Sequence, residues 1–264
     1  KISKKTKAIL IVHVLGNCVD MTELMHIVKR HKLILIEDTC ESLGTKFKNK
    51  YLGTFGDFSS FSFYSSHQIS SGEGGMICCK NNEDHEIIKS LRAHGWSRGL
   101  KNERKIASAN KHLDSRFIFY NSGFNLRSTD IAASIGFSQF KDLDKFIKCR
   151  TSNRIKILRS LKKNKKIQKK VTFIEANNHV KASWFGIPII LTKNINRNKF
   201  LKKIERIGVE TRPIISGNFL KQPSIKKYNL LLNSKFINSD IVNKHGIKFI
   251  GPSAKIISRM GDKI

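Results

Sequence analysis

An acidic residue and a histidine stand where two strand-like runs of the sequence end. The apolar residues 33–36 lead into Glu37 and Asp38. The β-rich residues 58–64 are followed by His67, within a stretch rich in Ser and Gly. In open α/β sheets, ligands bind at the carboxyl ends of the strands. A histidine at such an end can act as base and as acid near neutral pH, so the pattern predicts a site for proton-transfer chemistry.

The elements that must position these residues alternate between strand and helix. We expect a fully buried strand at 7–14, a helix capped by Asp20 that runs to His31, and the strand that ends near Asp38. This β-α-β order favours a parallel, doubly wound sheet. The punctuation of residues 44–57 by Gly and Lys indicates a loop or short hairpin. A further strand from 74 to 79 and a helix from Glu83 to Arg92 follow.

The second half of the chain predicts a smaller α+β domain. Residues 97–122 are polar and irregular, which is typical of a long surface segment. A helix that starts at Ser128 or Thr129 runs to about residue 143, and a second helix, at 145–162, crosses to another lobe. The remaining expected elements are strands at 171–175, 183–191 and 208–212 and helices at 196–206 and 239–247. The predicted domains are therefore residues 1–148, which bind the cofactor, and residues 149–264.

The net charge of +30 over 264 residues raises the possibility of nucleic-acid binding. Lysine is spread along the chain together with Asn and Ile, and the densest basic run, residues 162–170, fits a solvated helix end. We therefore predict no nucleic-acid partner, although a positive field would steer an anionic substrate towards the protein. The chain has no stretch of about 18 apolar residues, so we predict no membrane span.

The five cysteines favour free thiols in a reducing cytoplasm. Their number is odd, and their spacing fits neither a disulfide framework nor a zinc site, so we predict no metal. No signal-peptide pattern opens the sequence. The chain starts at Lys1, directly before a strand-like run, and we expect that it lacks its beginning.

Two motifs resemble a known protein family. The first combines Asp38, Ser62 and the run from Phe63-Tyr64 to Gly72-Glu73-Gly74-Gly75, and the second is the run from Gly123 to Asp130, Gly-Phe-Asn-Leu-Arg-Ser-Thr-Asp. They are similar to the sugar-nucleotide aminotransferases of the DegT/DnrJ/EryC1/StrS family, which have the pyridoxal-phosphate fold type I. The resemblance implies an α/β fold, with a mostly parallel sheet, flanking helices and a smaller C-terminal α+β domain. It also implies that an N-terminal part of the fold, which carries a Gly-Ser/Thr phosphate loop in relatives, is missing.

The resemblance assigns cofactor roles to four residues that would, in isolation, be ordinary turn or cap residues. Asp38 would keep the pyridine nitrogen of the cofactor protonated, so that the ring accepts electrons. Glu41 falls near the ring hydroxyl, and Ser62 would bind the cofactor phosphate. Asn125 would reach the phosphate of a neighbouring subunit, which implies a homodimer.

His67 occupies the position at which the family carries a lysine that holds pyridoxal phosphate covalently. The resemblance therefore implies pyridoxamine phosphate, bound without a covalent link, with His67 as the catalytic residue. Family members with histidine here remove the C3 hydroxyl of a nucleotide-linked 4-keto-6-deoxyhexose, such as a GDP-4-keto-6-deoxymannose-like sugar, in deoxysugar and lipopolysaccharide biosynthesis. Glutamate regenerates the amine form of the cofactor in these relatives. Residues 91–98, with His94 and Arg98, and residues 210–220, with Arg212, resemble segments of these relatives, and the second segment falls where relatives contact substrate. The resemblance therefore assigns His94, Arg98 and Arg212 to substrate binding, where arginine can bind oxygen atoms in a bidentate manner.

The sequence argues against one alternative and leaves two open. An iron–sulfur dehydratase also carries histidine at this position, but residues 80–148 contain no cysteine to hold a cluster, so we predict none. An aminotransferase would normally need a lysine in place of His67. A truncated, non-catalytic paralogue is the third possibility. The sequence does not decide between GDP and CDP sugars.

Overall fold

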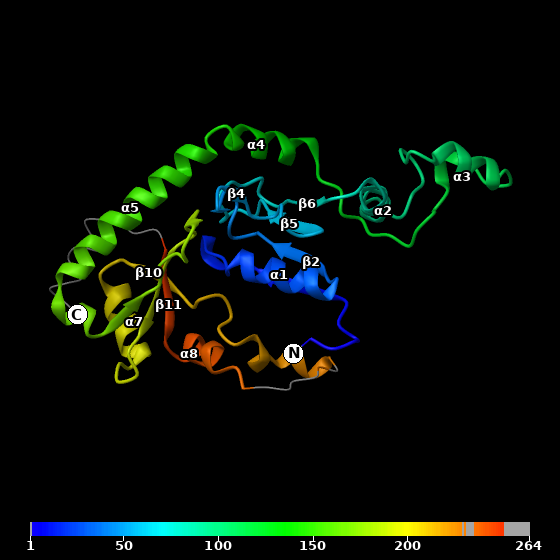
Figure 1. The fold of residues 1–264 in the computed structure, drawn as a ribbon. Coiled ribbons are helices and arrows are strands. Elements are labelled where there is room, and N and C mark those ends of the chain that lie inside the picture. Colours follow the sequence, from blue (N-terminus) through cyan, green and yellow to red (C-terminus); the bar gives the residue numbers. More distant parts are fainter. Residues whose placement is uncertain (1, 229, 231–234, 251–264) are drawn as a thin grey trace. The chain divides into compact units, whose positions relative to one another are not determined.

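A computed structural model describes residues 2–228, 230 and 235–250 of the chain (Figure 1). The fold divides into two compact units. The first comprises Lys1–Asp144 and Asn178–Lys181, and the second comprises Lys145–Asn177 and Ala182–Ile264. The functional domain boundary at residues 148 and 149 stays a prediction.

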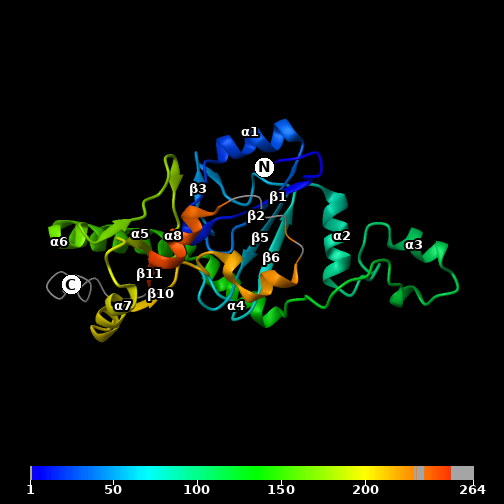
Figure 2. The same cartoon turned by 90° about the horizontal axis from the view of Figure 1, so that it is seen from below.

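The first unit contains a four-stranded mixed sheet of order β1-β2-β5-β6, whose strands Figure 2 shows side by side. These strands are β1 (Ala8–Val12), β2 (Ile34–Asp38), β5 (Phe58–Ser62) and β6 (Gly75–Cys79). β2 is parallel to both β1 and β5, whereas β6 runs antiparallel to β5. The sheet is thus mostly parallel, and the carboxyl ends of β2 and β5 lie at the same edge.

Helix α1 (Met21–His31) connects β1 to β2. The Asp20 side chain accepts hydrogen bonds from the backbone N–H groups of residues 22 and 23, which caps the helix at the predicted residue. Met21 and Val28 are buried on its inner face, in one apolar cluster with Leu35 of β2.

The expectation that the first strand is fully buried is wrong. β1 alternates between exposed and half-buried residues, and the side chains of Leu10 and Val12 are 62% and 46% exposed. The physical reason is its place at the edge of the sheet. The partly buried side chains of Ile9 and Ile11 pack on the cluster beneath α1, while the alternate side chains point to the opposite face.

A short hairpin follows β2, as the sequence predicts. β3 (Lys46–Phe47) pairs with β4 (Lys50–Tyr51), and β8 (Val180–Lys181) adds a third strand on the other side of β3. Residues Lys48 and Asn49 form the turn with positive φ angles of 46° and 66°. The described remainder of the unit contains helices α2 (Asn82–Arg92), α3 (Glu103–Ala109) and α4 (Asp130–Phe140) and the 3-10 turns η1 (Val14–Gly16) and η2 (Ser115–Phe117). The segment 97–122 is therefore not wholly irregular, because α3 lies within it.

Helix α5 (Leu143–Lys163) leads into the second unit. Its sheet has the order β10-β11-β9-β7, and all neighbours are antiparallel. The strands are β7 (Val171–Phe173), β9 (Ile187–Leu191), β10 (Glu210–Arg212) and β11 (Gly246–Ile250). Helices α6 (Lys165–Gln168), α7 (Arg197–Arg206) and α8 (Ile237–His245) and the 3-10 turns η3 (Phe219–Lys221) and η4 (Pro223–Lys227) complete its described elements.

The sequence-based expectation misplaces the end of the last helix. α8 stops at His245, and the residues up to 247, expected to be helical, already belong to β11. β11 is an inner strand of the second sheet, in which Ile247 and Phe249 are 0% and 2% exposed. Its partner β9 lies far away in sequence, so no local pattern indicates the pairing.

All five cysteines are free thiols. Within the part of the chain that the structure describes, no helix is both long and apolar enough to cross a membrane.

Candidate active site

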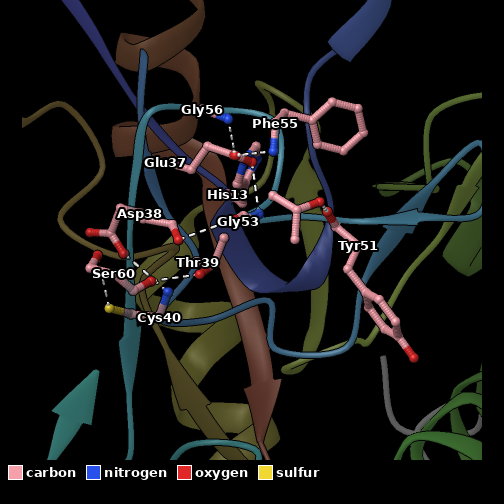
Figure 3. Close-up of polar contacts among 12 residues, drawn as sticks. His13, Glu37, Asp38, Thr39, Cys40, Tyr51, Gly53, Phe55, Gly56 and Ser60 are labelled. Carbon is pink, nitrogen blue, oxygen red and sulfur yellow. Dashed lines mark hydrogen bonds and ion pairs between the residues drawn. The ribbon is translucent and has the colours of Figure 1, made fainter. Parts of the chain in front are cut away.

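Asp38 is the last residue of β2 and lies beside Ser60 of β5. Its carboxylate accepts a hydrogen bond from the Cys40 backbone N–H at 3.0 Å (Figure 3). The next residue, Thr39, donates both its backbone N–H and its hydroxyl to the Ser60 carbonyl oxygen, at 2.9 and 2.5 Å. These contacts join the ends of β2 and β5 and hold the Asp38 carboxyl group at the sheet edge.

Cys40 closes this group of residues. Its Sγ atom lies 3.7 Å from the Ser60 hydroxyl. Burial, together with the neighbouring Asp38 carboxylate, raises the pKa of the Cys40 thiol to about 11. The thiol is therefore protonated at neutral pH and is a poor nucleophile.

Glu37 precedes Asp38 and is fully buried, on the opposite face of the strand. Its carboxylate accepts hydrogen bonds from three backbone N–H groups of the loop before β5: Gly53 at 2.8 Å, Phe55 at 2.8 Å and Gly56 at 2.6 Å (Figure 3). The Nε2 atom of the equally buried His13 lies 3.2 Å from the same carboxylate. A buried charge is tolerated only when it is matched in this way.

The pKa of Glu37 lies below its usual range. Burial alone would raise it, but the hydrogen bonds from His13, Gly56 and Gly53 together outweigh this effect. The carboxylate is thus ionised at neutral pH, one residue away from Asp38.

The loop that surrounds Glu37 needs glycine at two positions. Gly53 has a φ angle of +82°, which disfavours any residue with a side chain, and a Cβ atom at Gly56 would lie 2.6 Å from the Leu35 carbonyl oxygen. These glycines let the backbone approach closely enough for its N–H groups to reach the carboxylate.

His67 lies in a turn just beyond β5. Its backbone N–H donates to the Tyr64 carbonyl oxygen at 2.9 Å, and the two rings meet edge to face with centroids 5.8 Å apart. Ser62, on β5, accepts a hydrogen bond from the Tyr64 N–H at 3.2 Å. The half-buried His67 is therefore fixed relative to the end of β5.

Two amide side chains tie the His67 turn to its surroundings. The Gln68 amide donates to the Glu41 carbonyl oxygen at 2.6 Å, and the Glu41 carboxylate accepts the Leu15 N–H at 2.9 Å. The Gln139 side chain of α4 exchanges hydrogen bonds of 3.0 and 2.7 Å with the backbone of Ser70. Four of the predicted residues, Asp38, Glu41, Ser62 and His67, are thus gathered around the ends of β2 and β5.

His94, Arg98 and Asn125 form a second group in the same unit. The segments that carry them are joined by isolated bridges between Ala93 and Asn125 and between Trp96 and Phe119. The His94 N–H donates to the Phe124 carbonyl oxygen at 2.7 Å, and the His94 ring lies 5.0 Å from that of Trp96.

Two guanidinium groups also pack against the indole ring of Trp96. Those of Arg98 and Arg127 lie 4.8 and 5.5 Å from its centroid. Arg98 additionally donates to the Arg116 carbonyl oxygen at 2.7 Å. Arg127 was not among the predicted site residues, although it belongs to the same motif as Asn125.

Arg212 belongs to β10 in the second unit, whereas the other predicted residues belong to the first. It forms an exposed ion pair with Glu210, with an Nη2–Oε1 distance of 2.8 Å. Its assignment to substrate binding stays a prediction.

The sequence reasoning missed the buried pair of His13 and Glu37 and the amide of Gln139. One signal was available for Glu37: a second acidic residue inside an otherwise apolar strand, followed by two glycines three positions apart. Nothing in the local sequence marks His13 or Gln139, because each of their contacts joins residues far apart in the chain.

The two sheets and their covering helices define the aminotransferase fold of pyridoxal-phosphate-dependent proteins. The chain belongs to the DegT/DnrJ/EryC1/StrS aminotransferase family, whose model matches residues 1–249. Family and fold, both expected from the motifs, are therefore confirmed.

Among curated relatives, the chain is 34% identical over 256 residues to the GDP-4-keto-6-deoxy-D-mannose 3-dehydratase of Escherichia coli O55:H7. The alignment covers 95% of this chain but only 64% of that protein, so the chain spans slightly less than two thirds of its relative. A solved structure of the E. coli enzyme with bound hydrated PLP superposes with a TM-score of 0.88 at 32% identity, covering 99% of this chain and 68% of the other. A further structure of the GDP-4-keto-6-deoxymannose-3-dehydratase, with a trapped PLP-glutamate geminal diamine, has the same TM-score at 31% identity and the same coverage.

Proposed function

We propose that the protein is a pyridoxamine-phosphate-dependent lyase that removes the C3 hydroxyl of a nucleotide-linked 4-keto-6-deoxyhexose, with a GDP-linked sugar as the first candidate. One observation carries the proposal: His67 stands in the turn after β5, and residues 51–79 contain no lysine that could hold the cofactor covalently. The similarity to GDP-4-keto-6-deoxy-D-mannose 3-dehydratases supports the choice of reaction and sugar.

The residues at the strand ends fit the cofactor chemically. Asp38 supplies an anion at the edge of the sheet, suited to a protonated ring nitrogen. Ser62 accepts a hydrogen bond from Tyr64 and keeps its own hydroxyl proton to donate to a phosphate oxygen. Glu41, which follows Cys40 in the chain, would lie near the ring hydroxyl of the cofactor. Asn125 would donate a hydrogen bond from its side-chain amide to the cofactor phosphate of a neighbouring subunit.

When bound, pyridoxamine phosphate supplies the amine that condenses with the C4 ketone and the ring that accepts electrons. The protein supplies the proton transfers. His67 removes a proton from the methylene carbon next to the amine and then donates a proton to the departing C3 oxygen. A neutral imidazole can do both in turn, because its ordinary pKa lies near neutrality.

Three further roles complete the proposal. His94, Arg98 and Arg212 bind the sugar and the diphosphate, and the guanidinium groups of the two arginines are suited to the diphosphate. Glutamate returns the amine to the cofactor. The enzyme works as a homodimer in the cytoplasm and needs no iron–sulfur cluster, nucleic acid or membrane.

The test uses the full natural chain, loaded with pyridoxal phosphate and treated with borohydride. We expect borohydride to leave no cofactor attached covalently to the protein, because no lysine stands at position 67. With glutamate and the GDP-4-keto-6-deoxy sugar, the enzyme should release ammonia and a 3,6-dideoxy product without an added reductase. A stable reduced adduct on a lysine, or formation of the 4-amino sugar, would identify an aminotransferase instead. An empty chain that neither binds the cofactor nor turns over would identify a non-catalytic paralogue.

A further inference from the structure

The buried pair of His13 and Glu37 is connected to Asp38 through the backbone. Glu37 is the chain neighbour of Asp38, and its carboxylate meets the His13 ring. The backbone N–H of His13 in turn donates to the Asp38 carbonyl oxygen at 2.9 Å. His13 therefore contacts both residues of the Glu37-Asp38 pair, one through its side chain and one through its backbone.

The loop of residues 53–56 adds a second connection. Three of its N–H groups are held by Glu37, and the loop continues into Asp57, which accepts the Leu35 N–H at 2.8 Å. β5 starts at the next residue and carries Ser60, the acceptor for Thr39. Glu37, near the end of β2, is thus linked through its carboxylate to His13 at the end of β1 and to the loop that leads into β5 (Figure 3).

The hydrogen bonds at position 37 require a carboxylate. An ionised carboxylate only accepts hydrogen bonds, so all four of its neighbours must donate, and the proton of His13 must sit on Nε2. A glutamine in its place would direct its own N–H₂ group at some of these donors. Burial of a charge is strongly unfavourable unless such bonds compensate for it, so a charged residue here does more than fill space.

We propose that Glu37 and His13 act as positioning residues that hold the Asp38 carboxylate where it can meet the ring nitrogen of the cofactor. Glu37 fixes the strand end from the face opposite Asp38, and His13 fixes the Asp38 backbone. The inference rests on the proposed function only in giving Asp38 a cofactor to bind. Whether Glu37 stabilises the end of β2 can be measured in the cofactor-free protein.

The experiment compares Glu37→Gln with Val28→Ala in the full natural chain. Val28 is buried on the inner face of α1 in the same unit, and its truncation lowers stability without removing any hydrogen bond at the strand ends. Two quantities are measured: amide hydrogen exchange of residues 36–42 and 53–57 in the cofactor-free protein, and the Kd and absorption maximum of bound pyridoxal phosphate.

We expect Glu37→Gln to accelerate exchange in both segments and to raise the Kd about 10- to 100-fold, by analogy with the range found for residues that orient the ligands of a bound metal. The absorption maximum should shift, because it reports on the environment of the ring nitrogen. Val28→Ala should leave the Kd and the spectrum unchanged. A folded Glu37→Gln protein with wild-type exchange, Kd and spectrum would overturn the proposal.

A second pair of variants keeps the test decisive if Glu37→Gln does not fold. His13→Gln retains an N–H donor within reach of Glu37, whereas His13→Phe removes it. We expect His13→Gln to keep the wild-type Kd and His13→Phe to raise it, and equal Kd values for the two would contradict the role of His13. If the wild-type protein binds no pyridoxal phosphate, the proposed function fails, while the exchange data still decide whether Glu37 holds the strand end.

Discussion

The end of β2 and the inner strands of the second sheet are stabilised in different ways. At the end of β2 the fully buried side chains include Glu37 and Thr39, each engaged in hydrogen bonds to neighbouring segments. The inner strands of the second sheet instead bury apolar side chains, such as Ile189 and Ile247, which join a single cluster with α5 and α7. Polar contacts are directional and fix a geometry. The free energy gained from apolar packing depends on the area buried and not on direction, so it mainly contributes stability.

This contrast separates residues that should affect chemistry from those that should affect folding. The first unit carries the candidate cofactor residues where a small displacement matters, because catalysis depends on the relative positions of the reacting groups. The second unit has a larger continuous core in which side chains are interchangeable if volume is kept. Substitutions in the two sheets should therefore change different measured quantities.

The largest expected effect is that of His67→Asn on activity. Loss of a general acid–base group typically lowers a rate by about 10²–10⁴-fold, and dehydration should fall by that factor. Because His67 is half-buried in a turn, the melting temperature should stay close to that of the wild type. Steady-state kinetics and thermal unfolding of the same preparation check both statements.

The matched variant at this position is His67→Lys. It should lose dehydration as well, but it should gain a borohydride-reducible covalent link to pyridoxal phosphate, and some 4-amino sugar should form with glutamate as donor. Near-full dehydratase activity in His67→Asn would mean that the histidine is a packing residue and that the proposed mechanism is wrong.

The next effect is on stability and belongs to the second sheet. Ile204 of α7 is fully buried in the apolar cluster, and Ile204→Ala should lower the free energy of unfolding by about 2–5 kcal/mol. Ile155 of α5 is 51% exposed, and Ile155→Ala should change it by no more than about 0.5 kcal/mol. Denaturant titration of both variants tests the comparison. Equal losses would show that the cluster does not carry the stability of this unit.

The same contrast explains what the sequence could predict. The ends of β2 and β5 were predictable because β1, α1, β2, β5 and the motif around His67 follow one another along the chain. The capping of α1 by Asp20 was predictable from residue type alone, because an N-cap bond is local.

Long-range pairings were not predictable from local patterns. β11 was missed because its pairing with β9 joins segments separated by more than fifty residues, and the apolar residues of Gly246–Ile250 also suit a helix end. His13 meets Glu37, and Gln139 meets Ser70, only once the chain is folded. The half-exposed face of β1 was not predictable either, since an apolar run does not reveal which face is covered.

The smallest expected effect concerns the exposed ion pair of Glu210 and Arg212 on β10. Their side chains are 57% and 62% exposed, and such pairs contribute about 0–1 kcal/mol because water screens the attraction and two long side chains lose freedom. Glu210→Gln should therefore leave the free energy of unfolding nearly unchanged. If Arg212 binds the diphosphate, releasing it from Glu210 should hold or slightly lower the KM for the nucleotide sugar, whereas Arg212→Gln should raise that KM and leave stability unaltered. A large loss of stability in Glu210→Gln would contradict this view of the second sheet. It would mean that an exposed carboxylate contributes as much to the stability of its sheet as we expect only of a buried, hydrogen-bonded one such as Glu37.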